Sequence, residues 1–399
     1  MISAPGAWSP LVEGEAAAQA LAAAEAIARD LARDPQAAVP GLGLSGSQAG
    51  LALFFAYLEQ SLGYAEAGER AQRHLDRAIA ELAEQPAPAA SLYGGFAGVA
   101  WVVEHLTAGE TSAEEEDPNE DIDAALLSLL RRSPWRGEFD LLGGLVGWGV
   151  YALERLPRPS AAAMLPLVVA RLAECAERGA HGIAWRDPRN AAREPDPGMA
   201  HGTAGAIALL ARMLQEGAAG PEAASLLTAT VDGVLARSSQ DEEGDLAWCA
   251  GNAGLSVALL AAGRACGRDD WDRAARRLAA AAAERYPDDP GGFDPALCHG
   301  TAGLSHLFHR WYQATGDPAL LAAARRWFER TLARRRPGQG IGGYLCRSRQ
   351  ADGRLGWIPD PGFLGGAAGI GLALLAAATP VEPAWDRLLL LSGRPGRPE

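Results

Sequence analysis

Seven copies of a glycine-ended tetrad divide the sequence into intervals of similar length, and this repeat restricts the possible folds more than any other feature. The tetrads are SQAG, GFAG, GLVG, GTAG, GNAG, GTAG and GAAG. Their last glycines are separated by 48, 49, 58, 49, 49 and 66 residues, which indicates a chain built from one repeated structural unit. These glycines are Gly50, Gly98, Gly147, Gly205, Gly254, Gly303 and Gly369.

Each unit of the repeat contains two kinds of predicted helix. The tetrads open runs that are apolar on nearly every face, as in 51–58 and 255–262, which is typical of buried helices. Between them lie segments with a single apolar stripe, as in 69–84 and 318–335, which is typical of surface helices. Seven such alternations without a linker predict an all-α fold, a double-layer α/α toroid with seven inner and seven outer helices. We expect one domain over residues 1–399.

Two of the longer intervals hold inserts, at about 182–198 and 342–362. Each contains a tryptophan, Trp185 or Trp357, among glycines, prolines and polar residues, and each insert includes the letters PDPG. The two tryptophans could line a substrate cleft, or they could be exposed loop residues.

Composition and charge exclude several classes of function. The chain has 36 basic and 49 acidic residues, and its formal net charge of −13 excludes a protein held to nucleic acid by general charge. All the cations are arginine, and the absence of lysine excludes a phosphate-binding GK[ST] loop and Schiff-base chemistry. No apolar run reaches the roughly 18 residues of a membrane span, and the first residues lack a signal-peptide pattern. We therefore expect a cytoplasmic protein with reduced thiols and no transmembrane segment.

Polar residues that interrupt the repeat gather just before the tetrads, where helix starts should meet. Cys249, Cys298 and His299 offer two thiolates and an imidazole, a soft ligand set that favours Zn²⁺ and leaves a fourth tetrahedral position open. The alternative is two buried thiols and a hydrogen-bonded core histidine. His201 fits either a capping or core role or a catalytic one. Asp140, taken alone, is better explained as a helix N-cap.

The motifs WCAGNAG, CHGTAG and AHGTAG, set in a seven-fold GxxG repeat, resemble the lanthionine synthetase C-like family, the lanthipeptide cyclases, over about 41–375. The resemblance implies a double toroid with Cys249, Cys298 and His299 as zinc ligands. It implies His201 as the general acid or base and Asp140 as the residue that orients it or shares its proton. The implied reaction is intramolecular Michael-type addition of a peptide cysteine thiol to dehydroalanine or dehydrobutyrine, which closes a thioether ring. The implied partners are a dehydrated precursor peptide and a separate dehydratase.

The sequence also departs from the family pattern. Members often carry Tyr directly after the first zinc cysteine, where Ala250 stands, and Arg four residues before that cysteine, where Asp245 stands. These departures keep open a second function, in which a relative of the cyclases adds glutathione or another thiol to dehydroamino acids. A glycoside hydrolase would need paired carboxylates, whereas Asp140 stands alone at the repeat positions. The complete zinc-ligand set together with His201 argues against a non-catalytic scaffold.

Overall fold

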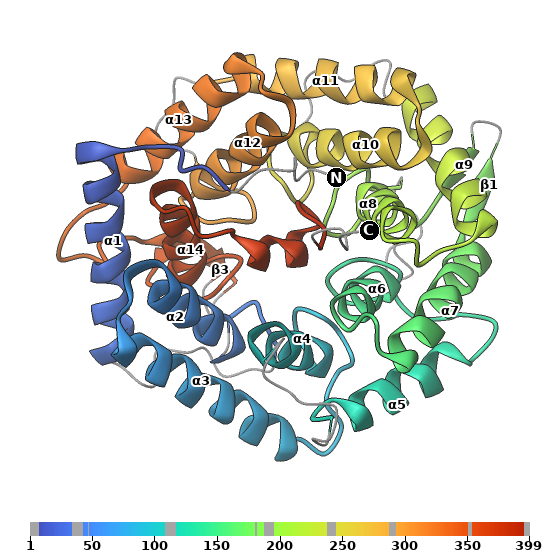
Figure 1. Cartoon of the computed structure of the whole chain (residues 1–399), viewed down its shortest axis with the longest axis horizontal. Coiled ribbons are helices and arrows are strands. Elements are labelled where there is room, and N and C mark those ends of the chain that lie inside the picture. Colours follow the sequence, from blue (N-terminus) through green and yellow to red (C-terminus); the bar gives the residue numbers. More distant parts are fainter. Residues whose placement is uncertain are drawn as a thin grey trace. The chain divides into compact units, whose positions relative to one another are not determined.

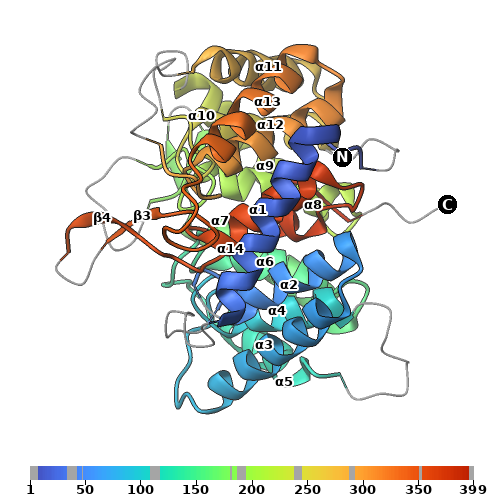
Figure 2. The same cartoon turned by 90° about the vertical axis from the view of Figure 1, so that its left-hand side faces the viewer.

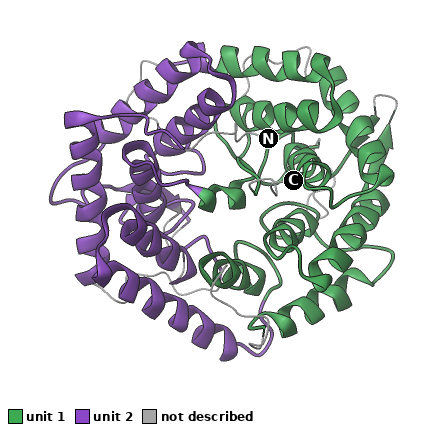
Figure 3. Cartoon of the chain, in the orientation of Figure 1, with its two compact units in different colours: residues 1–3, 89–282, 384–399 green, residues 4–88, 283–383 purple. Residues whose placement is uncertain are grey.

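The computed structural model describes most of the chain as two compact units (Figure 3). Unit 1 takes in residues 1–3, 89–282 and 384–399, and unit 2 takes in residues 4–88 and 283–383. No helix among the described residues is long and apolar enough to cross a membrane. The described residues are 8–33, 43–46, 48–107, 117–179, 182–186, 195–237, 245–286, 293–349 and 353–394.

Unit 1 alternates between helices that are buried on most sides, here called inner helices, and helices buried along one stripe, here called outer helices (Figure 1). Along the inner layer α4 contacts α6, α6 contacts α8, and α8 contacts α10. The inner helices are α4 (Phe96–Thr107), α6 (Leu145–Glu154), α8 (Thr203–Gln215) and α10 (Asn252–Cys266). The outer helices are α5 (Glu120–Leu130), α7 (Pro159–Cys175), α9 (Pro221–Arg237) and α11 (Asp269–Glu284), whose end passes into unit 2, and a 3-10 helix, η3 (Ala384–Leu389), completes the unit.

Unit 2 repeats the alternation. The inner helix α14 contacts both other inner helices, α2 and α12, while the outer helices α1, α3 and α13 pack on α14, α2 and α12 respectively. The inner helices are α2 (Gln48–Leu62), α12 (Thr301–Thr315) and α14 (Ala367–Ala378). The outer helices are α1 (Gly14–Arg33), α3 (Ala65–Ala83) and α13 (Pro318–Ala333).

The two sequence patterns produce these two kinds of helix through burial. All ten residues of α6 are buried. In α3, by contrast, only Ala67, Ala71, Leu75 and Ala78 are buried, a spacing of three and four residues that marks one stripe of a helix. Each large apolar side chain removed from water contributes roughly 1.5–3 kcal/mol. The apolar runs therefore form the centre of each unit, and the prediction of alternating buried and one-sided helices is confirmed.

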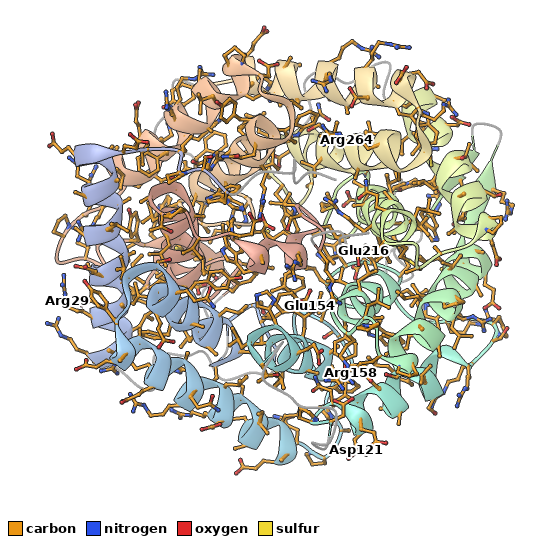
Figure 4. All side chains as sticks on the ribbon, in the orientation of Figure 1. Arg29, Asp121, Glu154, Arg158, Glu216 and Arg264 are labelled. Atoms are coloured by element: carbon orange, nitrogen blue, oxygen red, sulfur yellow. The ribbon has the colours of Figure 1, made fainter. Side chains whose placement is uncertain are left out.

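The buried carboxylate at the end of α6 shows how the inner layer accommodates charge (Figure 4). Glu154 lies with one carboxylate oxygen 2.8 Å from Nδ1 of His105 and accepts a hydrogen bond of 2.8 Å from Arg387 of η3. Burial opposes ionisation, but these partners outweigh it and hold the pKa of Glu154 below its usual value. The charge therefore ties η3 to the inner helices of unit 1.

The tetrad glycines are required because each inner helix begins by folding back onto the loop before it. A Cβ atom at Gly202 would overlap the carbonyl oxygen of Asp196, and one at Gly205 would lie 2.5 Å from the carbonyl oxygen of Met199. The same two overlaps recur at the tetrads that open α10 and α12. The repeat seen in the sequence is thus a steric requirement for close approach of backbone to backbone.

The two inserts contribute short antiparallel hairpins. Strand β2 (Gly182–Ala184) pairs with β1 (Glu177–Gly179), and β3 (Cys346–Arg349) pairs with β4 (Leu355–Ile358). Residues 187–194 and 350–352 of the inserts lie outside the described residues. Figure 2 shows the β3–β4 hairpin extending away from the helices of unit 2.

Only one of the insert tryptophans is exposed. Trp185 is buried and donates a hydrogen bond from Nε1 to the carbonyl oxygen of Leu172 at 3.0 Å. It therefore belongs to the core of unit 1, which neither interpretation from the sequence anticipated. Trp357, on β4, is 42% exposed.

Candidate active site

Four aspartates hold the loops that precede the inner helices. In each loop the aspartate accepts a hydrogen bond through Oδ1 from the backbone N–H two residues later, at 2.7–3.0 Å. The backbone carbonyl oxygen of the same residue accepts from the first N–H of the following helix at 2.8 Å. These are Asp196, Asp245, Asp294 and Asp360.

The loops share a seven-residue pattern, D-x-x-Φ-x-x-G, in which Φ is a buried apolar residue. Sequence analysis missed this pattern, although it is visible in DPGMAHG, DLAWCAG, DPALCHG and DPGFLGG. Asp245 is therefore a loop-forming residue of the repeat.

Loops of neighbouring repeats hydrogen-bond to each other at one position, two residues before the first glycine of the tetrad. In unit 1 the N–H of Tyr93 donates to the carbonyl oxygen of Leu142 (3.2 Å), and the N–H of Ala200 donates to that of Cys249 (3.0 Å). In unit 2 the N–H of Cys298 donates to the carbonyl oxygen of Leu364 (3.0 Å). Each unit thus places this position of one repeat against the same position of the next.

His201 and Asp140 come together in unit 1 although 61 positions separate them. Nδ1 of His201 lies 2.6 Å from Oδ2 of Asp140, whose other oxygen accepts a hydrogen bond of 2.7 Å from the N–H of Gly143. A third bond, from the N–H of Leu141 to the carbonyl oxygen of Ala200 (3.2 Å), joins the two loops. Because a carboxylate only accepts hydrogen bonds, Nδ1 carries the proton, and Nε2 is the basic nitrogen of the neutral ring.

The exposures of the pair suit proton exchange with a substrate. The side chain of His201 is 48% exposed, whereas that of Asp140 is 5% exposed. Neither residue caps a helix: α8 and α6 begin after Gly202 and Gly144, and no side chain donates to or accepts from either N-terminus as a cap. The capping interpretations of both residues are therefore wrong, and His201 does not lie in the core.

The three predicted ligands occupy corresponding loops of the two units. Cys249 is half-buried in the loop before α10 of unit 1, while in unit 2 Cys298 is half-buried and His299 exposed in the loop before α12. Each residue offers one ligand atom, a thiol sulfur or an imidazole nitrogen. Two sulfurs and an imidazole nitrogen fit zinc better than any hard cation. A fully buried, purely structural role does not fit these exposures.

Comparison with known proteins identifies the family. The family model described as lanthionine synthetase C-like protein matches residues 41–390. The chain belongs to this family. No curated protein sequence matches it.

Among solved structures, this lanthionine synthetase C-like chain is similar to "Nisin cyclase". The two share 18% sequence identity, with a TM-score of 0.68, and the match covers 92% of this chain and 96% of the other. The likeness confirms the predicted fold class, an all-α fold of the α/α toroid type.

The residue directly after the first predicted ligand has a small side chain. Ala250 is exposed in the loop before α10 and presents only a methyl group. Of the other histidines, His306 and His309 are buried on α12, so they support the core of unit 2. Burial lowers the pKa of His309 to about 3, which keeps its ring neutral.

Proposed function

We propose that this chain is a zinc-dependent lanthipeptide cyclase. It would add the cysteine thiols of a peptide to dehydroalanine or dehydrobutyrine and so form lanthionine and methyllanthionine rings. The observation that carries the proposal is the 2.6 Å contact between His201 and Asp140, in a loop hydrogen-bonded to the loop of Cys249. Membership of the lanthionine synthetase C-like family and the likeness to nisin cyclase support it.

The zinc ligands in this proposal are Cys249, Cys298 and His299. Two observations support the set. The donor atoms are those that zinc prefers, and three ligands leave the open position of a catalytic site. Cys249 and Cys298 also occupy the loop position at which neighbouring repeats hydrogen-bond within each unit.

Zinc bound to these residues would supply a Lewis acid that favours the deprotonated form of a substrate thiol. His201 would move the proton. Nε2 takes the hydrogen of the cysteine S–H group while sulfur bonds to the β-carbon, and it returns that hydrogen to the α-carbon of the resulting enolate. Asp140 holds Nδ1–H and stabilises the imidazolium that exists between the two transfers.

The remaining expectations from the sequence form part of the same proposal. The substrate would be a dehydrated precursor peptide made by a separate dehydratase, and the protein would work in the cytoplasm as a single domain. No nucleic acid is involved.

A second candidate is addition of glutathione or another free thiol to dehydroamino acids. The exposed methyl group of Ala250 favours it, because that residue offers no polar side chain to hold a reacting peptide.

Two parallel incubations distinguish the two functions. A peptide with one dehydroalanine and one cysteine should lose its reactivity toward N-ethylmaleimide as the ring closes, at unchanged mass. A cysteine-free dehydrated peptide with glutathione should stay unmodified if the protein is a cyclase. Gain of the mass of one glutathione, with no loss of maleimide reactivity in the first peptide, would establish the second function instead.

Metal content tests the ligand set separately. Cys298→Ala should lose zinc, measured by mass spectrometry of the purified protein, because it removes one of three ligands. The matched control is Cys266→Ala, at the half-buried last residue of α10, which should retain one zinc per chain. Full zinc content and full cyclisation in Cys298→Ala would refute the assignment.

A further inference from the structure

The β3–β4 hairpin of unit 2 presents apolar side chains to solvent on one of its faces. Leu355 is 55% exposed and Trp357 is 42% exposed. They lie two residues apart on β4, so they share a face of the strand, and Trp357 pairs in register with the exposed Arg347 on β3. We call Arg347, Leu355 and Trp357 the hairpin face.

Cationic groups lie close to this face. The guanidinium of Arg334 lies 5.9 Å from the ring centroid of Trp357, and Arg354, which directly precedes Leu355, is exposed. Strands β3 and β4 contain no acidic residue, although the chain as a whole carries a net charge of −13. A face that is both apolar and positive in an acidic protein fits a partner that is both apolar and negative.

The hairpin is fixed to the loop that carries two of the proposed zinc ligands. The backbone N–H of Arg347 donates a hydrogen bond to the carboxylate of Asp294. Asp294 is the first residue of the loop that ends with Cys298, His299 and the first tetrad glycine. A peptide bound on the hairpin face would therefore be held next to the part of unit 2 that we assign to the reaction.

We propose that the hairpin face binds an extended segment of the dehydrated precursor peptide that carries apolar and acidic residues on the same side. The identity of this partner as the precursor peptide rests on the proposed function. In an extended segment alternate side chains point the same way, so that apolar residues at two such positions pack on Trp357 and Leu355 while a carboxylate at another such position reaches Arg347. The hairpin would thereby select and retain the peptide while its cysteines react.

Peptide binding can be measured without any chemistry. The probe is a fluorescein-labelled, cysteine-free ten-residue peptide built from the repeat Leu-Ser-Glu-Ser, which places Leu and Glu on the same side of an extended chain. The anisotropy of this Glu–Leu peptide is followed in the presence of EDTA. Trp357→Ser should weaken binding about tenfold, the loss expected when one large apolar side chain is no longer covered. The matched control is Ile79→Ser, which removes a 45% exposed apolar side chain from α3 of the same unit and should leave the affinity unchanged.

A charge exchange provides a second, independent variant. Arg347→Glu should weaken binding of the Glu–Leu peptide several-fold at low salt and strengthen binding of a matching Lys–Leu peptide. Because the Arg347 side chain is exposed, this variant should keep the wild-type thermal unfolding curve. It therefore tests peptide binding by the hairpin face even if Trp357→Ser folds poorly.

Several results would overturn the proposal. These are wild-type affinity in both hairpin variants, an equal loss in Ile79→Ser, a wild-type preference for the Lys–Leu peptide, or no binding of either peptide. Failure of the proposed function looks different, because it would appear as missing zinc and missing cyclisation while binding to the hairpin face persists.

Discussion

Replacing Asp140 by Asn tests the catalytic pair most directly. The carboxylate of Asp140 is 5% exposed and lies 2.6 Å from Nδ1 of His201, so the substitution removes a shielded, charge-assisted hydrogen bond. A hydrogen bond to a charged group contributes roughly 1.5–3 kcal/mol, and the proton transfer creates the imidazolium that this charge stabilises. We therefore expect Asp140→Asn to slow cyclisation by roughly 10- to 150-fold.

The tautomer of His201 adds to this effect. An asparagine at 140 can present its amide NH₂ to Nδ1, which would move the ring proton to Nε2 and remove the basic nitrogen from the reacting side. The loss should therefore fall on the rate of ring closure and leave metal binding unchanged. The assay is the time course of disappearance of the maleimide-reactive thiol in a peptide with one cysteine and one dehydroalanine, with zinc content measured on the same preparation.

Asp245→Asn is the matched control. Oδ1 of Asp245 accepts a hydrogen bond from the N–H of Ala247 at 3.0 Å, which an asparagine side-chain oxygen accepts equally well. This variant should cyclise within about twofold of the wild-type rate. The reasoning fails if Asp140→Asn keeps the wild-type rate, or if Asp245→Asn slows the reaction to the same extent.

Three further predictions concern the stability of the scaffold. Gly303→Ala places a Cβ atom in overlap with the carbonyl oxygen of Leu297 and should cost about 1–3 kcal/mol in urea unfolding, whereas Gly220→Ala, where nothing lies within 4 Å, should not destabilise. Arg155→Met removes the fully buried cation shared by the carboxylates of Glu104, Asp117 and Asp123, and it should lower the free energy of unfolding by about 3–5 kcal/mol. An unchanged thermal unfolding curve would show that this network does not stabilise the fold. The pKa of His309 is lowered to about 3 by burial, so between pH 6.5 and pH 3 the unfolded chain binds a proton that the folded chain does not. The free energy of unfolding should therefore fall by up to about 1.4 kcal/mol per pH unit below pH 6.5, and His309→Gln should remove that part of the slope.

The sequence was sufficient to predict the fold because the repeat carries its own steric signature. Glycines in the tetrads mark where helix starts press against loop carbonyl oxygens, and the apolar runs after them mark the buried helices. Bonds formed between segments far apart in sequence were harder to anticipate. The inserts contain short hairpins, and Trp185 became a core residue through a hydrogen bond to Leu172 of α7, which nothing in the local pattern of the insert indicates.

Within the candidate site, the residue types were predictable but their partners were not. The sequence favoured a capping role for Asp140 because aspartate before a helix usually caps it. In the structure Gly144 occupies the N-cap position of α6. Asp140 does not cap the helix, because the loop closes through backbone hydrogen bonds. Its pairing with His201 is accompanied by the hydrogen bond between Leu141 and Ala200, and such contacts between two repeats cannot be read from either segment alone.

Each seven-residue loop contains positions that form the fold and positions that vary, and this explains how one repeat can provide both a scaffold and a reaction site. The aspartate, the buried apolar residue and the glycine satisfy the backbone and fill the core, so they recur from loop to loop. The side chains at the two positions before the glycine differ from loop to loop, and the position next to the glycine is exposed or half-buried in all four loops. The two positions hold Cys-Ala before α10, Cys-His before α12, Ala-His before α8 and Leu-Gly before α14. Chemistry can therefore be changed at those two positions with little effect on the fold, which is why the departures from the repeat, and not the repeat itself, indicate what this chain does.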